Sequence, residues 1–178
     1  MFVSAAGARS EQEMRLLGRL AKMNSSLDLI KEMPYNISIT DPKLLPQWWG
    51  PRYLSTLVDM MDMRPGGQWR FINRDTQGNE YAFHGVYHEI LAPERIIDTF
   101  EFEGLPETGH VSLETLTLEE LPGGRTRLTS QSVFRSVADR DGTLQSGMEE
   151  GVQDTYDRLA ELLKKEKDDG NDKERAKG

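Results

Sequence analysis

Residues 80–91, EYAFHGVYHEIL, are the stretch that decides the fold of this chain. Every second position from Tyr81 to Tyr87 is an aromatic residue or glycine, and a period of two is typical of a β-strand. Turn-forming sequences bound the stretch, DTQGN at 75–79 and APER at 92–95. The pattern therefore predicts one strand with an aromatic face.

The same period of two extends over the segments on both sides. Five further strand-like segments are LSTLVDMMDM (54–63), QWRFINRD (68–75), RIIDTFEFE (95–103), HVSLETLTLEEL (110–121) and RTRLTSQSVFR (125–135). Short turns rich in glycine and proline join them, and no helical pattern lies between them. Consecutive strands with such short connections pair antiparallel, so the sequence predicts a six-stranded meander.

After these strands the apolar pattern becomes helical. Ser136 followed by Asp139 resembles a capping box. The apolar stripe that follows consists of Leu144, Met148, Val152, Tyr156, Leu159 and Leu163. This spacing predicts one helix over 137–165. Residues 166–178 are charged and nearly without apolar side chains, which predicts a disordered tail.

Two glycines, Gly147 and Gly151, lie beside this stripe. A glycine costs about 1 kcal/mol relative to alanine in a helix interior. Either the helix backbone packs closely on the sheet at these positions, or space is left there for a ligand.

The segment before the strands, TDPKLLPQWWGP at 40–51, predicts a short helical turn that starts at Asp41 and Pro42. Its adjacent tryptophans, Trp48 and Trp49, must point in different directions, so at least one ring needs a pocket of its own. Upstream, EQEMRLLGRLAKM at 11–23 predicts an amphipathic helix.

We expect an N-terminal extension over 1–26, which contains this upstream helix, and a single domain over 27–165. The stretch LDLIKEM (27–33) either continues the helix or forms a strand.

Composition limits the classes of function. The 178 residues include no cysteine, which excludes disulfides and thiolate chemistry and fits a reducing cytoplasm. The formal net charge is −8, which makes nucleic acid and anionic membrane poor partners. No apolar run approaches the ~20 residues that span a bilayer, and the N-terminus lacks the pattern of a secretory signal.

Residues that could carry chemistry are scattered. His84 and His88 are four apart, but on a strand this spacing is ~13 Å, too far to share one metal ion. We therefore predict no metal site, and no cofactor motif is present. Four glutamates at alternate positions of strands fit solvated strand faces rather than an acid–base site: Glu101, Glu103, Glu114 and Glu120.

One sheet face is predicted to be rich in aromatic rings, through Trp69, Phe71, Phe83, Tyr87, Phe100 and Phe102. The last strand adds a mixed polar and apolar row, Thr126, Leu128, Ser130, Ser132 and Phe134. A plain core under the helix would suit the aromatic rings alone. The mixed row is typical of a ligand pocket.

The ordered set DPKLLPQWWGP, RPGGQWRF, NEYAFHGVYHEILAPERIIDTFEFE, GGRTRLT and LQSGMEEG resembles the START-like (SRPBCC) superfamily. Within it, the set is similar to bacterial homologues of heat-shock-protein ATPase activators, over roughly residues 40–163. The resemblance implies an α+β helix-grip fold: a curved antiparallel β-sheet wrapped around a long C-terminal α-helix, with a hydrophobic cavity between them.

When the family's cavity positions are carried over to this sequence, the resemblance implies walls from the sheet and the helix, with Trp48 and Trp49 near the mouth. The candidate ligand-binding residues, with Ser130 and Gly151 added from the strand and glycine patterns above, are Trp48, Trp49, Trp69, Phe71, Phe83, Tyr87, Phe100, Ser130, Met148, Gly151, Val152 and Tyr156. The stretch LDLIKEMPYNISITDP departs from the family pattern and favours a strand where the first grip helix is expected.

The resemblance leaves three functions open. The first is non-catalytic binding of a small apolar or amphipathic molecule. The second is a co-chaperone or protein-interaction module with a chaperone partner. The third is a cyclase- or dehydratase-like enzyme, which would require a buried group with a perturbed pKa, Asp98 or His84.

The unusual N-terminus also predicts an interaction. A first sheet edge left short exposes unpaired backbone groups. We expect the N-terminal segment to dock back over its own sheet edge or onto a second copy in a homodimer.

Overall fold

A computed structural model describes residues 22–30, 39–123 and 125–175 of the chain. Seven antiparallel strands form one sheet in the order β1-β7-β6-β5-β4-β3-β2. The strands are β1 Lys22–Ile30, β2 Ser55–Met61, β3 Gln68–Arg74, β4 Glu80–Leu91, β5 Arg95–Phe102, β6 Ser112–Leu121 and β7 Arg125–Phe134. The six predicted strands are β2 to β7, and their meander is confirmed.

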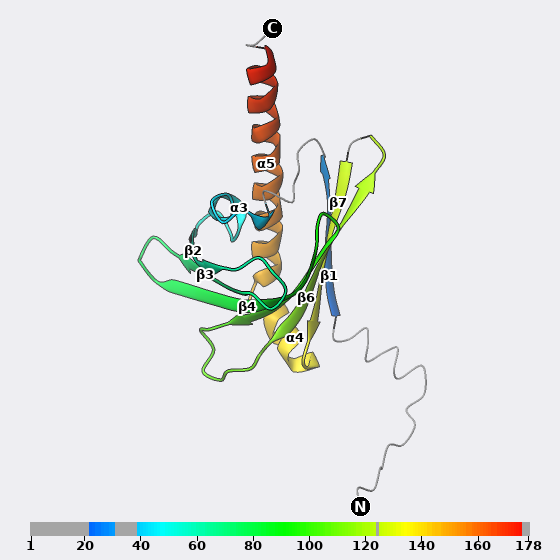
Figure 1. Ribbon diagram of the computed structural model, residues 1–178. Helices are drawn as coiled ribbons and strands as arrows, with labels where there is room; N and C mark the ends of the chain where they lie inside the picture. Colours follow the sequence, from blue (N-terminus) through cyan, green and yellow to red (C-terminus); the bar gives the residue numbers. More distant parts are fainter. Residues whose placement is uncertain (1–21, 31–38, 124, 176–178) are drawn as a thin grey trace, which may run out of the picture.

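The helices whose bounds lie within the described residues are α3 Leu45–Trp48, α4 Val137–Gln145 and α5 Met148–Arg175. Figure 1 shows the long α5 crossing the concave side of the curved sheet, with the short α3 beside it. This arrangement confirms the predicted α+β helix-grip fold. Within the described residues, no helix is both long and apolar enough to cross a membrane.

Strand β1 covers one edge of the meander by pairing antiparallel with β7 along its whole length. Residues 27–30 therefore form a strand, which settles the alternative that the sequence left open for them. Residues 22 and 23, predicted to be helical, also belong to β1, and residues 11–21 lie outside the described residues. This N-terminal strand thus docks on the edge of its own sheet. It begins at Lys22, inside the extension that was expected over residues 1–26.

The single C-terminal helix predicted over 137–165 is wrong in two respects. First, the chain breaks between α4 and α5, where Gly147 has a φ of 78°. Glycine adopts this left-handed conformation without a Cβ clash, so Gly147 ends a helix rather than lying in its interior.

Second, α5 continues to Arg175, where a disordered tail was expected from residue 166. Lysine and glutamate are good helix formers, and extending an existing helix needs no new nucleus. A charged composition therefore does not stop a helix that packing has already started.

Two irregularities accompany the curvature of the sheet. The register shifts between Val58 and Met60 in β2 and between Tyr87 and Glu89 in β4. Such bulges bend a strand and increase its twist. They help the sheet to curve around α5.

The core lies between the concave sheet face and the helices. Its buried apolar side chains are Ile39, Leu45, Trp48, Trp69, Phe71, Tyr87, Leu118, Leu128, Leu159, Leu162 and Leu163. Leu159 and Leu163 belong to the predicted stripe, whereas Leu144 is 39 % exposed. The stripe therefore packs in its C-terminal part, and α4 lies outside the core.

Candidate functional site

The concave face of the sheet carries the aromatic cluster that the sequence predicts. Trp69, Phe71 and Tyr87 are buried, while Phe83 and Phe100 are partly buried against them. The rings of Trp69 and Phe71 stack with their centroids 4.7 Å apart, and those of Phe83 and Phe100 are 5.3 Å apart. The alternation read from the sequence thus gives the correct face for these residues.

The two adjacent tryptophans separate as their geometry requires. Trp48 is buried in the core on α3. Trp49 is partly buried and meets the rings of Phe71 and Phe83 edge-on, with centroids 5.1 and 5.4 Å away. Edge-to-face pairs of this kind are attractive. Trp49 therefore extends the aromatic cluster from the sheet to the α3 segment.

The other predicted site residues lie around this cluster. Met148, Val152 and Tyr156 are partly buried on α5, and Ser130 is partly buried on β7. A Cβ added at Gly151 would find no described atom within 4 Å, outside its own helix backbone and chain neighbours. Close packing of the helix backbone is thus disfavoured at Gly151, and open space is favoured. The pocket predicted between α5 and the aromatic face stays a prediction.

A row of polar side chains crosses the same face. Register pairs Tyr87 with Asp98, Asp98 with Glu114, and Glu114 with Ser132, across β4, β5, β6 and β7. Glu114 accepts hydrogen bonds from Ser112 Oγ, at 2.5 Å, and from Ser132 Oγ. Glu114 is therefore held inside the fold, which differs from the solvated strand face predicted for it.

Burial changes the acidity of this row. Burial first, and then the Glu114 carboxyl, raise the pKa of Asp98 to about 8, against an opposing contact with the Trp69 indole N–H. Burial also raises the pKa of Glu114, although its two serine hydrogen bonds oppose the rise. Burial and the Asp98 charge raise the pKa of the Tyr87 hydroxyl. The sequence named Asp98 as a candidate buried acid, whereas it assigned Glu114 to a solvated strand face.

The sequence gives a poor signal for Glu114 because its strand lacks a clean alternation. Leu116 and Leu118 share the inner face with Glu114, but Leu113 lies on the outer face and is 41 % exposed. Leucines on both faces hide which face is buried.

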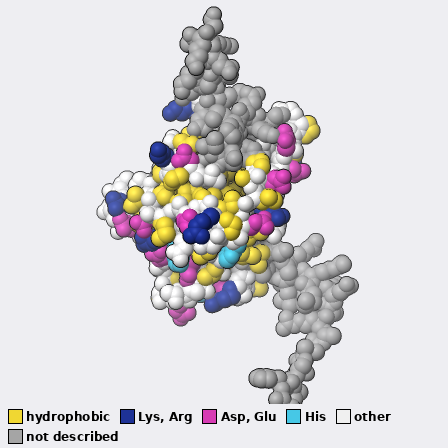
Figure 2. All heavy atoms as spheres, viewed as in Figure 1, with side chains coloured by type: hydrophobic (Ala, Val, Ile, Leu, Met, Phe, Trp, Pro, Cys, Tyr) yellow, Lys and Arg dark blue, Asp and Glu magenta, His cyan; other side chains and the backbone are white. Residues whose placement is uncertain are grey.

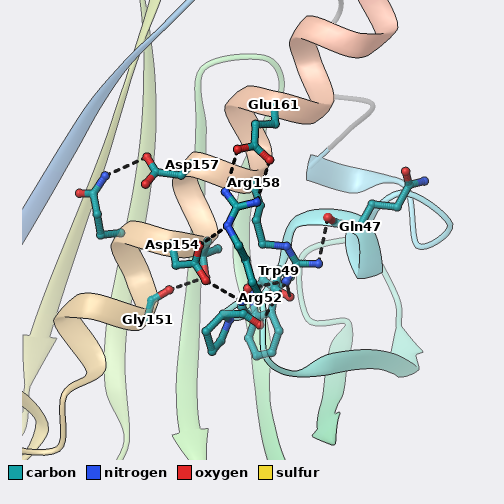
Figure 3. A network of polar contacts seen from close by, with 12 residues as sticks. Gln47, Trp49, Arg52, Gly151, Asp154, Asp157, Arg158 and Glu161 are labelled. Atoms are coloured by element: carbon teal, nitrogen blue, oxygen red, sulfur yellow. Dashed lines mark hydrogen bonds and ion pairs between the residues drawn. The ribbon is translucent and has the colours of Figure 1, made fainter. Parts of the chain in front are cut away.

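An arginine network closes the α3 side of this face, as Figure 3 shows. Arg158 of α5 donates from Nη1 to the Gly50 carbonyl at 2.6 Å and from Nη2 to the Gln47 carbonyl at 3.0 Å. These are carbonyl groups at the C-terminal end of α3, which have no partner within so short a helix. Burial lowers the pKa of Arg158, and Asp154 opposes this.

A second arginine, Arg52, joins the residues just after α3 to α5. Its guanidinium binds both Glu161 oxygens at 2.8 Å, and its Nε lies 2.7 Å from Asp154. The hydrogen bond with Arg52 lowers the pKa of Glu161. The sequence gives no local signal for either arginine, since their partners lie about a hundred positions away.

The histidines lie away from the aromatic face. His84 Nδ1 is 3.2 Å from Glu103 on the outer side of the sheet, but this contact lacks hydrogen-bond geometry. His88 is exposed, and His110 Nδ1 lies 2.9 Å from Asp139. The part of the chain that is described contains no group of three metal-ligating side chains.

A shallow recess lies near the β4–β5 turn, lined in part by the core residues Ile39 and Leu118. It lies between Ile39 and Thr40 on one side and Pro93 and Ile96 on the other, and it leaves about 20 Å³, on the scale of one water molecule. Figure 2 shows hydrophobic side chains gathered in the middle of one face, interrupted by charged ones. The recess is too small for an amphipathic ligand.

Solved structures with the same fold come from several bacteria. A protein from Arthrobacter aurescens matches with a TM-score of 0.75 and 21% identity, over 83% of this chain and 88% of its own. One from Nitrosomonas europaea matches with 0.69 and 27%, over 83% and 97%. The AHSA1 protein of Silicibacter pomeroyi matches with 0.67 and 24%, over 82% and 99%.

Comparison with curated protein sequences gave no match. The family model described as "Activator of Hsp90 ATPase homolog 1-like protein" matches residues 37–164. These residues include α3, strands β2 to β7 and most of the packed part of α5. The chain belongs to the Activator of Hsp90 ATPase homolog 1-like family.

Proposed function

We propose that the protein binds a small hydrophobic or amphipathic molecule, without catalysis, between α5 and the aromatic sheet face. The observation that carries this proposal is the composition of the face: a cluster of aromatic rings borders a row of polar side chains, Tyr87, Asp98, Glu114 and Ser132. A mostly apolar wall with a few convergent polar groups is typical of ligand sites. The cysteine-free sequence fits the cytoplasm as its location.

Gly151 offers a direct test of the site. A leucine at this position would extend into the space where no described atom lies within 4 Å of the added Cβ. We expect Gly151→Leu to reduce uptake of an environment-sensitive apolar dye, while the melting temperature stays the same or rises, because leucine is the better helix former.

Gly142→Leu is the matched control. Gly142 is a helical glycine of α4 with equally open surroundings, but it is exposed and lies away from the aromatic face. This control should take up dye as the wild type does. Equal uptake by all three proteins would remove Gly151 from the site. Absence of dye uptake and of a co-purified molecule in native mass spectrometry of the wild type would contradict the proposed function.

The family description favours a second candidate, a module that acts on a heat-shock-protein ATPase. Such a role requires an exposed surface for a partner. Tyr53 and Leu57, 73 % and 53 % exposed near the β2 edge, are the first residues to test. The measurement is the ATPase rate of an Hsp90-type chaperone with and without this protein, and with Leu57→Ser.

One residue, Asp98, supports the alternative that the protein is an enzyme. Asp98 is a partly buried carboxyl with a raised pKa, as the enzyme alternative requires. Raised pKa values also occur in binding sites and structural clusters, so Asp98 alone does not define a reaction. Binding is the simpler function for this arrangement.

A further inference from the structure

Asp98 and Glu114 lie side by side in the middle of the concave face. They are register partners on β5 and β6, and directly opposite residues of an antiparallel pair have Cβ atoms about 4.5–5.5 Å apart. Two carboxyl groups this close repel each other when both are ionised. If these two positions served stability alone, apolar residues there would make the fold more stable.

The protein supplies no cation to this pair within the described residues. Basic side chains of the sheet form ion pairs with other carboxylates: Arg95 on β5 with Glu89, Arg127 on β7 with Glu119, and Arg70 on β3 with Glu103 and Asp59. Neither Asp98 nor Glu114 forms an ion pair among the described residues. Among the described residues, a negative charge on this pair is therefore not neutralised by an ion pair.

The Trp69 indole N–H is a buried hydrogen-bond donor that influences Asp98. The Trp69 side chain is only 3 % exposed, and its indole nitrogen has no hydrogen-bond partner of regular geometry among the described residues. The indole nitrogen lies over Gly85, and the indole N–H opposes the rise in the pKa of Asp98. An unpaired buried donor costs free energy, so a geometry that satisfies it is favoured. Ionised Asp98 is the stronger acceptor for this N–H.

The two carboxyls differ in the hydrogen bonds they already have. Glu114 receives both neighbouring serine hydroxyls, from Ser112 and Ser132. Asp98 receives no such hydroxyl among the described residues and retains acceptor positions. Aromatic rings share this face: Phe100 follows Asp98 by two residues on β5, and its ring centroid lies 5.9 Å from that of Trp69. Aromatic faces attract an alkylammonium group through cation–π interaction. The same group donates strong, charge-assisted hydrogen bonds to a carboxylate.

We propose that Asp98, supported by Glu114 and the Trp69 indole, binds the ammonium head of an alkylamine-type amphiphile whose apolar tail lies on the aromatic face. This inference rests on the proposed function and assigns the chemical class of its ligand. The head donates hydrogen bonds to Asp98, and the indole N–H donates to the same carboxylate.

The proposal has a characteristic pH dependence. The groups that influence Asp98 are Glu114 on β6 and the Trp69 indole on β3, while Tyr87 on β4 responds to the Asp98 charge. Among the described residues, no charged side chain of α4 or α5 affects the pKa of Asp98. Because Asp98 has a pKa of about 8, an ammonium ligand at pH 7 must displace a proton.

The experiment compares three probes with one tail: octylamine, 1-octanol and octanoate. The assay measures how well each probe displaces the apolar dye from the full-length protein, at pH 7 and at pH 8.5. We expect octylamine to bind about tenfold more tightly than octanol, since a charge-assisted hydrogen bond is stronger than a neutral one. Its affinity should rise between the two pH values, and calorimetry in buffers of different ionisation enthalpy should detect proton release.

Asp98→Asn should remove the preference for octylamine, its pH dependence and the proton release, while octanol binds as before. Glu119→Gln is the matched control, because Glu119 lies on the outer face of β6 and is exposed. It should behave as the wild type does. Circular dichroism checks that both variants fold.

Two other outcomes separate the proposals. If the three probes bind alike and Asp98→Asn changes nothing, the ammonium site is overturned while the cavity stands. If no probe displaces dye, or the wild type takes up no dye, both the cavity and its head-group site are overturned.

Discussion

Single residues in this fold act through what lies opposite them on the sheet. Gly85 faces Trp69 across β4 and β3, and the indole ring lies over the glycine. Asp98 faces Tyr87 on one side and Glu114 on the other. The pairing of Gly85 with Trp69 requires that position 85 has no side chain. The pairing of Asp98 with Glu114 brings two carboxyl groups together. Both effects depend on register.

Gly85→Ala tests the first pairing. The added Cβ would lie 1.7 Å from the Thr99 carbonyl oxygen and 2.7 Å from Trp69. Because backbone must move to relieve the clash, we expect a loss of about 3 kcal/mol or more in the free energy of unfolding, measured by urea denaturation. Gly142→Ala has open space and should be neutral or stabilising by up to about 1 kcal/mol. Similar effects of the two changes would refute the close approach.

Asp98→Asn tests the second pairing through pH. The folded-state pKa, about 8, exceeds the unfolded value near 3.8. The folded protein therefore binds more protons between these values, and stability falls as pH rises from about 4 to 8. The contribution is fully present below the unfolded pKa and lost above the folded one. Asparagine lacks this titration, so the variant should gain melting temperature relative to the wild type from pH 5 to pH 9. A constant difference would contradict the buried ionisation.

Elements are joined by a few side chains that span long distances in the sequence. The four-residue α3 is too short to be stable alone, and its carbonyl groups depend on Arg158 of α5. Arg52 adds ionic contacts with Asp154 and Glu161 beside it. These exposed pairs are screened by water and contribute little each. The contact of Arg158 with the Gly50 carbonyl matters more because it is partly buried.

Arg158→Met tests this connection. Methionine keeps much of the length but leaves the carbonyl groups of Gln47 and Gly50 without their donor. We expect a loss of about 1–3 kcal/mol in urea unfolding, with altered tryptophan fluorescence because Trp48 and Trp49 lie on the same segment. Arg95→Met removes only an exposed pair with Glu89 and should cost less than about 1 kcal/mol. Equal losses would mean that α3 is held by packing alone.

The whole molecule is an open sheet with two edges, β1 and β2. Strand β1 shields β7, which otherwise would present a row of unpaired backbone groups. The homodimer expected from the N-terminal departure stays a prediction. So does the division of the chain into extension, domain and tail, although β1 and α5 cross its proposed boundaries.

Two truncations test the role of β1. Removing residues 1–21 leaves β1 intact, whereas removing residues 1–30 deletes it. Only the longer deletion exposes the β7 edge, so we expect it to lower the melting temperature and to cause self-association. Light scattering coupled to size-exclusion chromatography measures the association. If both truncated proteins behave alike, β1 contributes nothing to edge protection.

The sequence by itself determined the local structure of this protein. Period-two alternation located β2 to β7, turn residues set their ends, and Ser136 was identified as the cap of α4, where its Oγ accepts from the Asp139 N–H at 3.1 Å. The aromatic residues were placed on the correct face for the same reason. Each of these features depends on neighbours a few positions apart, which the sequence shows directly.

Only the tertiary structure decided which distant side chains meet. It placed Glu114 beside Asp98, brought Arg158 to the end of α3, and seated β1 on β7. It also broke the C-terminal helix at Gly147 and extended α5 past residue 165. These features depend on strand register, on burial and on the neighbours each element finds. A one-residue slip in register would reverse the face of every side chain on a strand, and the chain resolves that choice only by packing as a whole.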